Sequence, residues 1–258
     1  RVLFRSVDGQ VNPVRDKETI DIELQLKDLE TIEKRMQRIE KAARVGTDKD
    51  AKKTFEIYQT LKGHLEKGLS ARSAPLSEEE WKIAEDLMLL TTKPVLYVCN
   101  VDEGSVVGGN EHVEAVRKAI QGENADILII AAAIEADIAQ LESFEDRKAF
   151  LDDLGLTESG VAKLIKAAYE LLKLQTYFTA GEKEVRAWTI HQGMTAPQAA
   201  SVIHTDFEKG FIRAEVIHYD DFIKYGSEAG CRDAGKLAVE GKEYIVQDGD
   251  LMHFRFNV

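Results

Sequence analysis

The sequence contains little that would cross-link the chain or anchor it in a membrane. Its 258 residues include two cysteines, four prolines and 7% aromatic residues. Two cysteines are too few for a disulfide scaffold, and Cys99 lies in an apolar segment that suits a reduced core thiol. No apolar run approaches the ~20 residues of a membrane helix, and the start does not resemble a signal peptide. These absences predict a soluble, cytoplasmic protein that contacts no membrane.

An excess of positive charge is also missing. Lysine and arginine number 34 against 46 aspartates and glutamates, which gives a formal net charge of −12. This balance argues against broad, non-specific coating of nucleic acid. The apolar content of 44% is enough to bury the core of one large domain or two ordinary ones.

One local basic stretch departs from the acidic average. Residues 34–53 read "KRMQRIEKAARVGTDKDAKK", in which basic residues outnumber acidic ones. Charge runs are usually the solvated face of a helix, and that is one interpretation. The other is a surface that contacts RNA phosphates.

Helical periodicity dominates the first third of the chain. Apolar residues recur at three- and four-residue spacing over residues 17–45, Gly46 interrupts them, and a second amphipathic pattern follows. Two such helices joined by a short polar turn predict an antiparallel helical hairpin. Ser77 and Glu80 form a capping box at the start of a third helix.

The middle of the chain alternates strands and helices. "PVLYVC" and "ADILIIAAA" predict two strands of a parallel sheet with both faces covered. Helices are expected near residues 111–120, after Ser143 and from Thr157. Two parallel strands do not make a stable sheet alone, so the chain is expected to lack part of its own fold.

The last 85 or so residues predict a small separate module. Short strands are expected at "LQTYFTAG", "EVRAWTI", "GFIRAEVI", "EYIVQDGD" and "LMHFRFNV", with helices starting at Thr195 and after Tyr219. Strands wrapped around a helix favour an α+β barrel-like or β-grasp fold. The boundary is expected near residues 172–175.

The end of the first strand, "KPVLYVCNVDEG", carries a candidate base-binding motif. The amide of Asn100 suits the N7 of a purine and the neighbouring backbone. Guanine-binding proteins place an Asp three residues after such an Asn, whereas this chain has the longer Glu103, which favours adenine over guanine. Val101 takes the place of the lysine that usually covers the base. The alternative is a turn in which Asn100 and Asp102 hydrogen-bond their own backbone.

The end of the second strand is made of small residues. Ala131, Ala132 and Ala133 would let a base or sugar approach the backbone closely, although tight strand–helix packing explains them equally well. The nearest match to a phosphate-binding loop is "GCRDAGKL", residues 230–237, which lacks both the Ser or Thr and the preceding strand and is interpreted as a helix leading into a loop. His204 is interpreted as part of a turn, and no metal-ligand spacing is present.

The C-terminal half resembles a known family. "LQTYFTAGEKEVRAWTI", "TAPQAASVIHTDFEKGFIRAEVI" and "YIVQDGDLMHFRFNV" are similar to the YchF family, the Obg-like ATPases, as are "NVDE" and "VNPVRD". The resemblance covers nearly all of residues 7–258. It implies an α/β fold: the C-terminal part of a P-loop G domain with an inserted helical hairpin, followed by a small β-grasp (TGS) domain.

The resemblance also implies domain boundaries and ligands. Residues 1–16 would be a remnant of the G domain (1–6 being a candidate non-native start), 17–76 the hairpin, 77–172 the C-terminal half of an Obg-type G domain and 173–258 the TGS domain. ATP would be the nucleotide, with Mg²⁺ ligands missing from this chain, and the ribosome the partner of a cytoplasmic, monomeric protein. The implied nucleotide-binding residues are Asn100, Val101, Glu103, Ala131, Ala132 and Ala133. The candidates for contact with RNA or ribosomal protein are Lys34, Arg35, Arg38, Lys41, Arg44, Lys209 and Arg213.

The chain departs from the family pattern at its start. The P-loop and both switch regions of the family would lie upstream of Val7, and no such motifs are found here. The expected function is therefore part of a ribosome-associated ATPase, with no catalytic residues in this chain and no hydrolysis by it alone. Two alternatives stay open: a non-catalytic module that binds ribosome, RNA or protein, and a GTP-binding protein of the Obg group.

Overall fold

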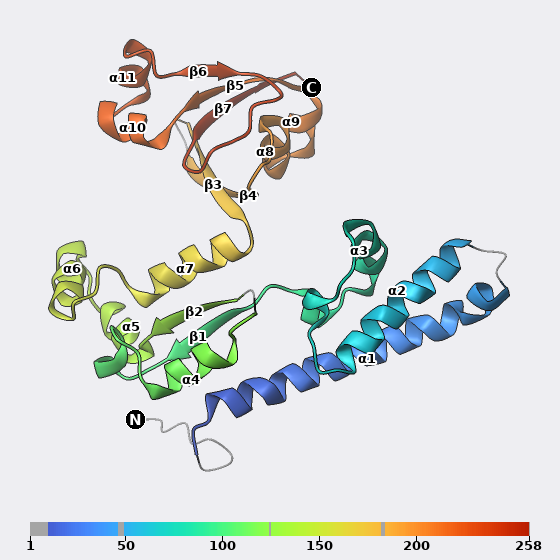
Figure 1. Cartoon of the computed structure of the whole chain (residues 1–258). Coiled ribbons are helices and arrows are strands. Elements are labelled where there is room, and N and C mark those ends of the chain that lie inside the picture. Colours follow the sequence, from blue (N-terminus) through green and yellow to red (C-terminus); the bar gives the residue numbers. More distant parts are fainter. Residues whose placement is uncertain (1–9, 46–48, 124, 182–183, 258) are drawn as a thin grey trace. The chain divides into compact units, whose positions relative to one another are not determined.

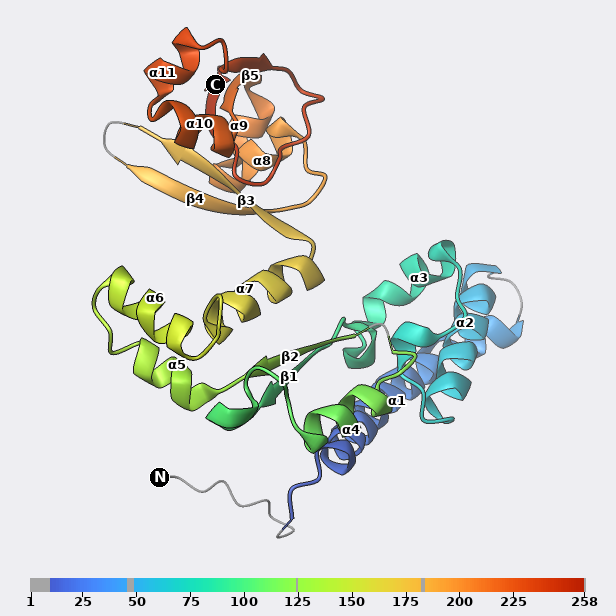
Figure 2. The same ribbon diagram turned by 60° about the vertical axis from the view of Figure 1, so that its left-hand side comes forward.

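The chain forms two compact units, residues 1–164 and 165–258. A computed structural model describes residues 10–45, 49–123, 125–181 and 184–257, and Figures 1 and 2 show its elements from two sides. The candidate non-native start, residues 1–6, lies outside this description. Within the described ranges, no helix is both long and apolar enough to cross a membrane.

The predicted helical hairpin is present and consists of α1 (Pro13–Val45) and α2 (Lys49–Leu65), which lie side by side (Figure 1). Ile32, Ile57 and Leu61 are buried between the helices. The first helix begins four residues earlier than the periodicity indicates. Its start is set by Asn12, whose side-chain oxygen accepts a hydrogen bond from the Arg15 backbone N–H at 3.1 Å, and by Pro13 in the first turn.

A segment of short helical turns connects the hairpin to the sheet. It contains 3₁₀ turns at Ala71–Ser73, Glu85–Leu87 and Leu90–Thr92, with α3 (Glu78–Ala84) between the first two. The predicted capping box of α3 is confirmed, because the side chains of Ser77 and Glu80 each bond the backbone N–H of the other.

The α/β part of the first unit contains two parallel strands, β1 (Leu96–Asn100) and β2 (Asp126–Ile130), in register from Leu96 opposite Asp126 to Asn100 opposite Ile130. The helices of this part are α4 (Glu111–Ala119), α5 (Ala132–Ile138) and α6 (Phe144–Asp153), and α7 (Gly160–Leu171) crosses the boundary into the second unit. The helices expected near residue 111 and after Ser143 are present, and Asn110 and Ser143 cap their first turns. The helix expected from Thr157 instead begins at Gly160, because Ser159 bonds the N–H of Ala162.

The prediction that both faces of these strands are covered is wrong for the described chain. Neither β1 nor β2 contains a fully buried residue, and Val98 is 42% exposed. The described residues therefore cover less of these two apolar strands than their sequence predicts.

The second unit is a five-stranded mixed sheet in the order β4-β3-β7-β5-β6, in which β3 and β7 run parallel and the other neighbours antiparallel. The strands are β3 (Leu174–Ala180), β4 (Val185–His191), β5 (Phe211–Ile217), β6 (Ala238–Glu240) and β7 (Leu251–Phe256). The helices are α8 (Ala196–Ile203), α9 (Thr205–Lys209), α10 (Tyr219–Tyr225) and α11 (Glu228–Asp233). Tyr177, Ala214 and Met252 have no exposed surface and lie in a core shared with α8.

One predicted strand of this unit is wrong. The segment "EYIVQDGD" contributes only an isolated bridge between Ile245 and Thr195, while β6 forms earlier. The chain turns instead because Gly249 has a φ of +84° and the carboxylate of Asp250 accepts a hydrogen bond from the Gln247 N–H at 2.9 Å.

Candidate functional site

The predicted base-binding residues meet where the two parallel strands end. The Val101 N–H donates to the carbonyl of Ile130 at 2.8 Å, and the side-chain oxygen of Asn100 accepts from the Ala132 N–H at 3.0 Å. Asn100 thus ties the end of β1 to the first turn of α5. Its amide nitrogen has no partner among the described residues and lies on an exposed side chain, so it remains free to donate to a ligand.

The three alanines occupy different environments. Ala131 is 1% exposed and packs with Ile134, Ile138 and Leu156, which is the structural role that the sequence left open. Ala132 and Ala133 are exposed at the start of α5. Only these two can offer small side chains to a ligand without rearrangement.

Glu103 lies in the loop that follows β1. It begins a 3₁₀ turn, Glu103–Ser105, and its side chain is exposed and has no hydrogen-bond or ion-pair partner among the described residues. Asp102 precedes this turn without capping it. The alternative was a turn in which Asn100 and Asp102 hydrogen-bond their own backbone. Instead, the Asn100 side chain bonds the junction between β2 and α5, and the Asp102 side chain makes no capping bond to its own turn.

A carboxylate that the sequence did not single out supports this junction from behind. Glu135, in α5, accepts hydrogen bonds from the N–H groups of Gly160 at 2.6 Å and Val161 at 3.2 Å, at the start of α7. A side chain at position 160 would lie 2.9 Å from Ile130 and from Glu135, so the close approach requires glycine. No local signal marks this contact, because it joins segments that are distant in the sequence.

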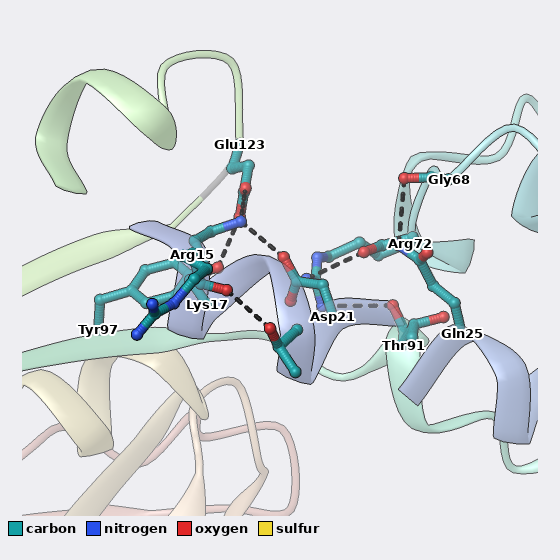
Figure 3. Close-up of polar contacts among 11 residues, drawn as sticks. Arg15, Lys17, Asp21, Gln25, Gly68, Arg72, Thr91, Tyr97 and Glu123 are labelled. Atoms are coloured by element: carbon teal, nitrogen blue, oxygen red, sulfur yellow. Dashed lines mark hydrogen bonds and ion pairs between the residues drawn. The ribbon is translucent and has the colours of Figure 1, made fainter. Parts of the chain in front are cut away.

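A half-buried ionic cluster connects the hairpin with the strand that carries Asn100 (Figure 3). The Lys17 ammonium lies 2.6 Å from a carboxylate oxygen of Asp21 and 2.7 Å from one of Glu123. The hydroxyl of Tyr97, in β1, donates to the second oxygen of Glu123 at 2.9 Å. The lysine side chain is only 12% exposed.

This environment shifts the pKa values of Lys17, Glu123 and Tyr97. Burial would lower the pKa of Lys17, but the hydrogen bonds with Asp21 and Glu123 outweigh it and hold that pKa above its ordinary value. Burial would raise the pKa of Glu123, but the bonds from Lys17 and Tyr97 keep it below its usual range. Burial, and then the Glu123 carboxylate, raise the pKa of Tyr97. Lys17 and Glu123 therefore stay ionised at neutral pH, and the Tyr97 hydroxyl stays protonated.

A second polar contact holds the segment that leads into β1. Asp28, 2% exposed, accepts bonds from the N–H groups of Leu90 and Thr91 and from the Thr91 hydroxyl, at 2.7–2.8 Å. Arg72 donates to the carbonyls of Thr91 and Lys93. Asp28 of the hairpin and Arg72 of the connecting segment thus hold in place the residues that lead into β1 and the candidate site.

The open face of β1 forms part of a hollow of about 560 Å³. Asn100 and Val101 lie at one part of its wall, and apolar side chains of α1, including Ile20 and Leu24, contribute another. Among the described residues, no group of three or more His, Cys, Asp and Glu side chains is arranged to hold a metal ion.

The candidate ribosome-contact residues are all surface groups, but several are already neutralised. Lys34 pairs with Glu30, Arg44 with Glu40 at 2.6 Å, and Arg35 lies 3.9 Å from Asp86. Arg38 and Lys41 are exposed, with no carboxylate within ion-pair distance among the described residues. Lys209, in α9, and Arg213, in β5, are exposed on the second unit and are not part of the hairpin surface.

The two segments set aside by the sequence have structural roles. The "GCRDAGKL" segment is the last part of α11 followed by a loop, as predicted. His204 caps the short helix α9, with its Nδ1 accepting from the Asp206 N–H at 3.2 Å.

Together, two parallel strands with their helices and a C-terminal module built on a five-stranded mixed sheet define an α/β protein of two units. Residues 174–257 match the family described as "YchF-GTPase_C: Protein of unknown function (DUF933)". The chain is 53% identical to the "Ribosome-binding ATPase YchF" of Bacillus subtilis over 98% of its own length and 69% of the relative's. It is 40% identical to the "Obg-like ATPase 1" of Rattus norvegicus, over 97% of this chain and 64% of that one.

Solved structures agree. The chain superposes on the structure of the Schizosaccharomyces pombe YchF GTPase with a TM-score of 0.84 and 35% identity, over 98% of this chain and 68% of that one. A GTP-binding protein from Pyrococcus horikoshii, at 16% identity and a TM-score of 0.58, shares the fold alone. The chain belongs to the YchF family of Obg-like ATPases, and the predicted family and α/β fold class are confirmed.

Proposed function

We propose that this chain forms the base-binding and ribosome-contacting part of a ribosome-associated, ATP-hydrolysing protein of the cytoplasm. The observation that carries the proposal is the Asn100 side chain, which is fixed by the Ala132 N–H at 3.0 Å with its amide nitrogen open to a ligand. The names of the relatives, which describe ribosome-binding and Obg-like ATPases, support the activity.

Adenine suits this site better than guanine. A guanine-specific carboxylate must accept from N1–H and the 2-amino group, and adenine has neither donor. The exposed Glu103 is one methylene longer than the aspartate used for that purpose, and Val101 offers an apolar, half-buried side chain in place of a lysine. Ala132 and Ala133 leave room for the base on the other side.

Binding of fluorescent ATP and GTP analogues tests the assignment. The measurement uses the chain itself and a version extended upstream by about one hundred residues, the size of a half-domain that would hold a phosphate site. Asn100→Ala is expected to weaken ATP binding about tenfold, as for the loss of one or two hydrogen bonds. Asn257→Ala, an exposed asparagine of the second unit, is the matched control. A preference of the extended form for GTP, or an Asn100→Ala variant that binds as well as its parent, would contradict the assignment.

Hydrolysis by this chain alone is not expected. Positioning of phosphates and charge stabilisation supply nearly all of phosphoryl-transfer catalysis. The nearest phosphate-loop match, residues 230–237, has Leu237 where the Mg²⁺-binding hydroxyl would be. Mg²⁺-dependent ATP turnover by the purified chain would refute this part of the proposal.

The hairpin surface is the proposed ribosome contact. Reversing the charge of Lys34, Arg35, Arg38 and Lys41 to Glu is expected to weaken co-sedimentation with ribosomes and to flatten its salt dependence, because each phosphate contact adds about one unit to the slope of log affinity against log salt. The same reversal at four exposed lysines of the first unit keeps the net charge equal; these are Lys67, Lys82, Lys118 and Lys148. Equal losses of ribosome binding in both variants would show that the basic residues of the hairpin are an ordinary solvated surface.

Outcomes of these two experiments separate the alternatives. Ribosome binding without nucleotide binding, even in the extended form, would favour a non-catalytic binding module. GTP preference with hydrolysis would favour a GTP-binding protein of the Obg group.

A further inference from the structure

The outer edge of β4 is an open pairing surface. This seven-residue strand bonds β3 on one side, and it lies at the end of the five-stranded sheet (Figure 2). The opposite end of the sheet is the three-residue β6, which is too short to pair with much.

The alternation of hydrogen bonds between β3 and β4 shows which backbone groups of β4 face outward. Gly181 N–H donates to the Glu184 carbonyl and Gln192 N–H to the Lys173 carbonyl, at 2.9 and 2.8 Å. In this register, with Leu174 opposite His191, hydrogen-bonded and non-hydrogen-bonded residue pairs alternate along the two strands. The even-numbered residues of β4 therefore make the backbone bonds with β3. The N–H and C=O groups of Val185, Ala187 and Thr189 therefore point away from the sheet. None of these groups has a backbone partner in the described ranges.

Among the described residues of the edge, Arg186 is the one charged side chain that could oppose pairing, and the other usual protections are missing. Natural edge strands are blocked by proline, lysine, a bulge or a short length. The sequence of β4 is "VRAWTIH", regular throughout its pairing with β3, and Val185 is 72% exposed. Ala187 and Thr189 are exposed as well, and neither is charged.

The side chains of this edge complement themselves in one register. We propose that β4 pairs antiparallel with β4 of a second copy of this chain, with Ala187 of each copy on the two-fold axis. Val185 then faces Thr189 of the second copy, and Arg186 faces Trp188 of the second copy. Arg186 already lies over the ring of its own Trp188 at 4.0 Å, so each cation gains a second indole.

Two other registers are less favourable. Moving the axis to Arg186 sets two arginines directly opposite each other, which like charge disfavours. Moving it to Thr189 loses the Arg186–Trp188 pairs and places Ala187 against His191, whose carbonyl already accepts from the Met194 N–H. Pairing through β4 goes beyond the proposed nucleotide and ribosome functions and does not depend on them. It predicts a concentration-dependent dimer, whereas the sequence interpretation expects a monomer.

Sedimentation of the full chain over a range of concentrations is the first test. The parent protein is expected to shift toward a dimer as its concentration rises. Ala187→Pro removes an outward N–H that β3 does not use, so it is expected to leave the fold intact and abolish the shift. Arg186→Glu is expected to weaken the dimer about tenfold. Arg232→Glu, an exposed charge reversal on α11, is expected to have no effect.

Disulfide formation tests the register. In a Cys99→Ser background, with Cys231 left in place because it has no exposed surface, Ala187→Cys is expected to cross-link with itself, since directly opposite residues lie about 5.5 Å apart between Cα atoms. Val185→Cys and Thr189→Cys are each expected to form no cross-link alone but to cross-link when mixed. A parent protein that remains monomeric at every concentration overturns the proposal. The proposal is overturned in the same way if the β4 edge pairs with an extended segment of another protein while the chain itself stays monomeric. Equal cross-linking of all three single variants also overturns it.

Discussion

The two sheets of this molecule are held in different ways. In the second unit, five strands enclose side chains such as Tyr177, Ala214 and Met252, which have no exposed surface. In the first unit, β1 and β2 are apolar but only half covered, and ionic and carboxylate contacts attach them to the hairpin. The sheet with a fully buried core thus depends on apolar packing, while the half-covered sheet depends more on directional polar contacts.

The carboxylate of Asp28 is expected to matter most in the open unit. Asp28→Ala removes three hydrogen bonds to a charged acceptor and leaves two backbone N–H groups without it, which is expected to destabilise the first unit by ~3 kcal/mol. Chemical denaturation followed by hydrogen exchange would place the loss in residues of the first unit. Asp137→Ala, at an exposed position of α5, is the control and is expected to change stability by less than ~0.5 kcal/mol. A small effect at Asp28 would mean that apolar packing also dominates the first unit.

The same substitution in both sheets compares them directly. Val216, in β5, is 2% exposed, so Val216→Thr buries an unpaired hydroxyl and is expected to cost ~2 kcal/mol. Val98, in β1, is 42% exposed, and Val98→Thr is expected to cost less than ~0.5 kcal/mol. Equal costs in urea denaturation would show that the open face of β1 is covered in solution.

Two glycines test where the first unit is closely packed. Gly160→Ala places a methyl group 2.9 Å from Ile130 and Glu135 and is expected to destabilise by ~1–2 kcal/mol. Gly63→Ala, in the last turn of α2 with no atom within 4 Å of the new methyl group, is expected to stabilise by up to ~1 kcal/mol. Thermal unfolding of the pair would distinguish them by the sign of the change.

The ionic cluster is expected to give the smallest effect and a pH dependence. Because the pKa of Glu123 is lowered in the folded state, its contribution is present above the ordinary carboxyl value and is lost as pH falls through the lowered one. Glu123→Gln is expected to cost ~1 kcal/mol at neutral pH. Denaturation from pH 7 to pH 3 should show the difference from the parent shrinking toward acid pH. A difference that is independent of pH would assign the cost to packing rather than charge.

Much of the fold could be predicted because its signals are local. The capping boxes, the helical periods and the strand-end Asn100 each lie within a few residues, so the sequence indicates them without knowledge of contacts. One failure was a local ambiguity. The segment "EYIVQDGD" alternates like a strand, but the Asp250 carboxylate and Gly249 turn it.

The site was predictable only in part. Asn100, Val101 and Ala132 meet as expected because parallel strands end at the same edge, whereas the burial of Ala131 and the Glu135–Gly160 contact were not visible in the sequence. Lys17 and Glu123 resemble ordinary surface charges when read along the chain. Their pairing depends on the long helix α1 passing β1, which no local pattern encodes.

By itself, the sequence determined the elements, the order of the two units and the family, since these rest on periodicity, caps and continuous motifs. Only the tertiary structure decided which charged groups are buried together, how far the faces of β1 and β2 are covered, and which backbone groups of β4 face outward. The physical reason is that burial and hydrogen-bond partners are properties of segments brought together in space, and a linear pattern specifies the segments without specifying their neighbours.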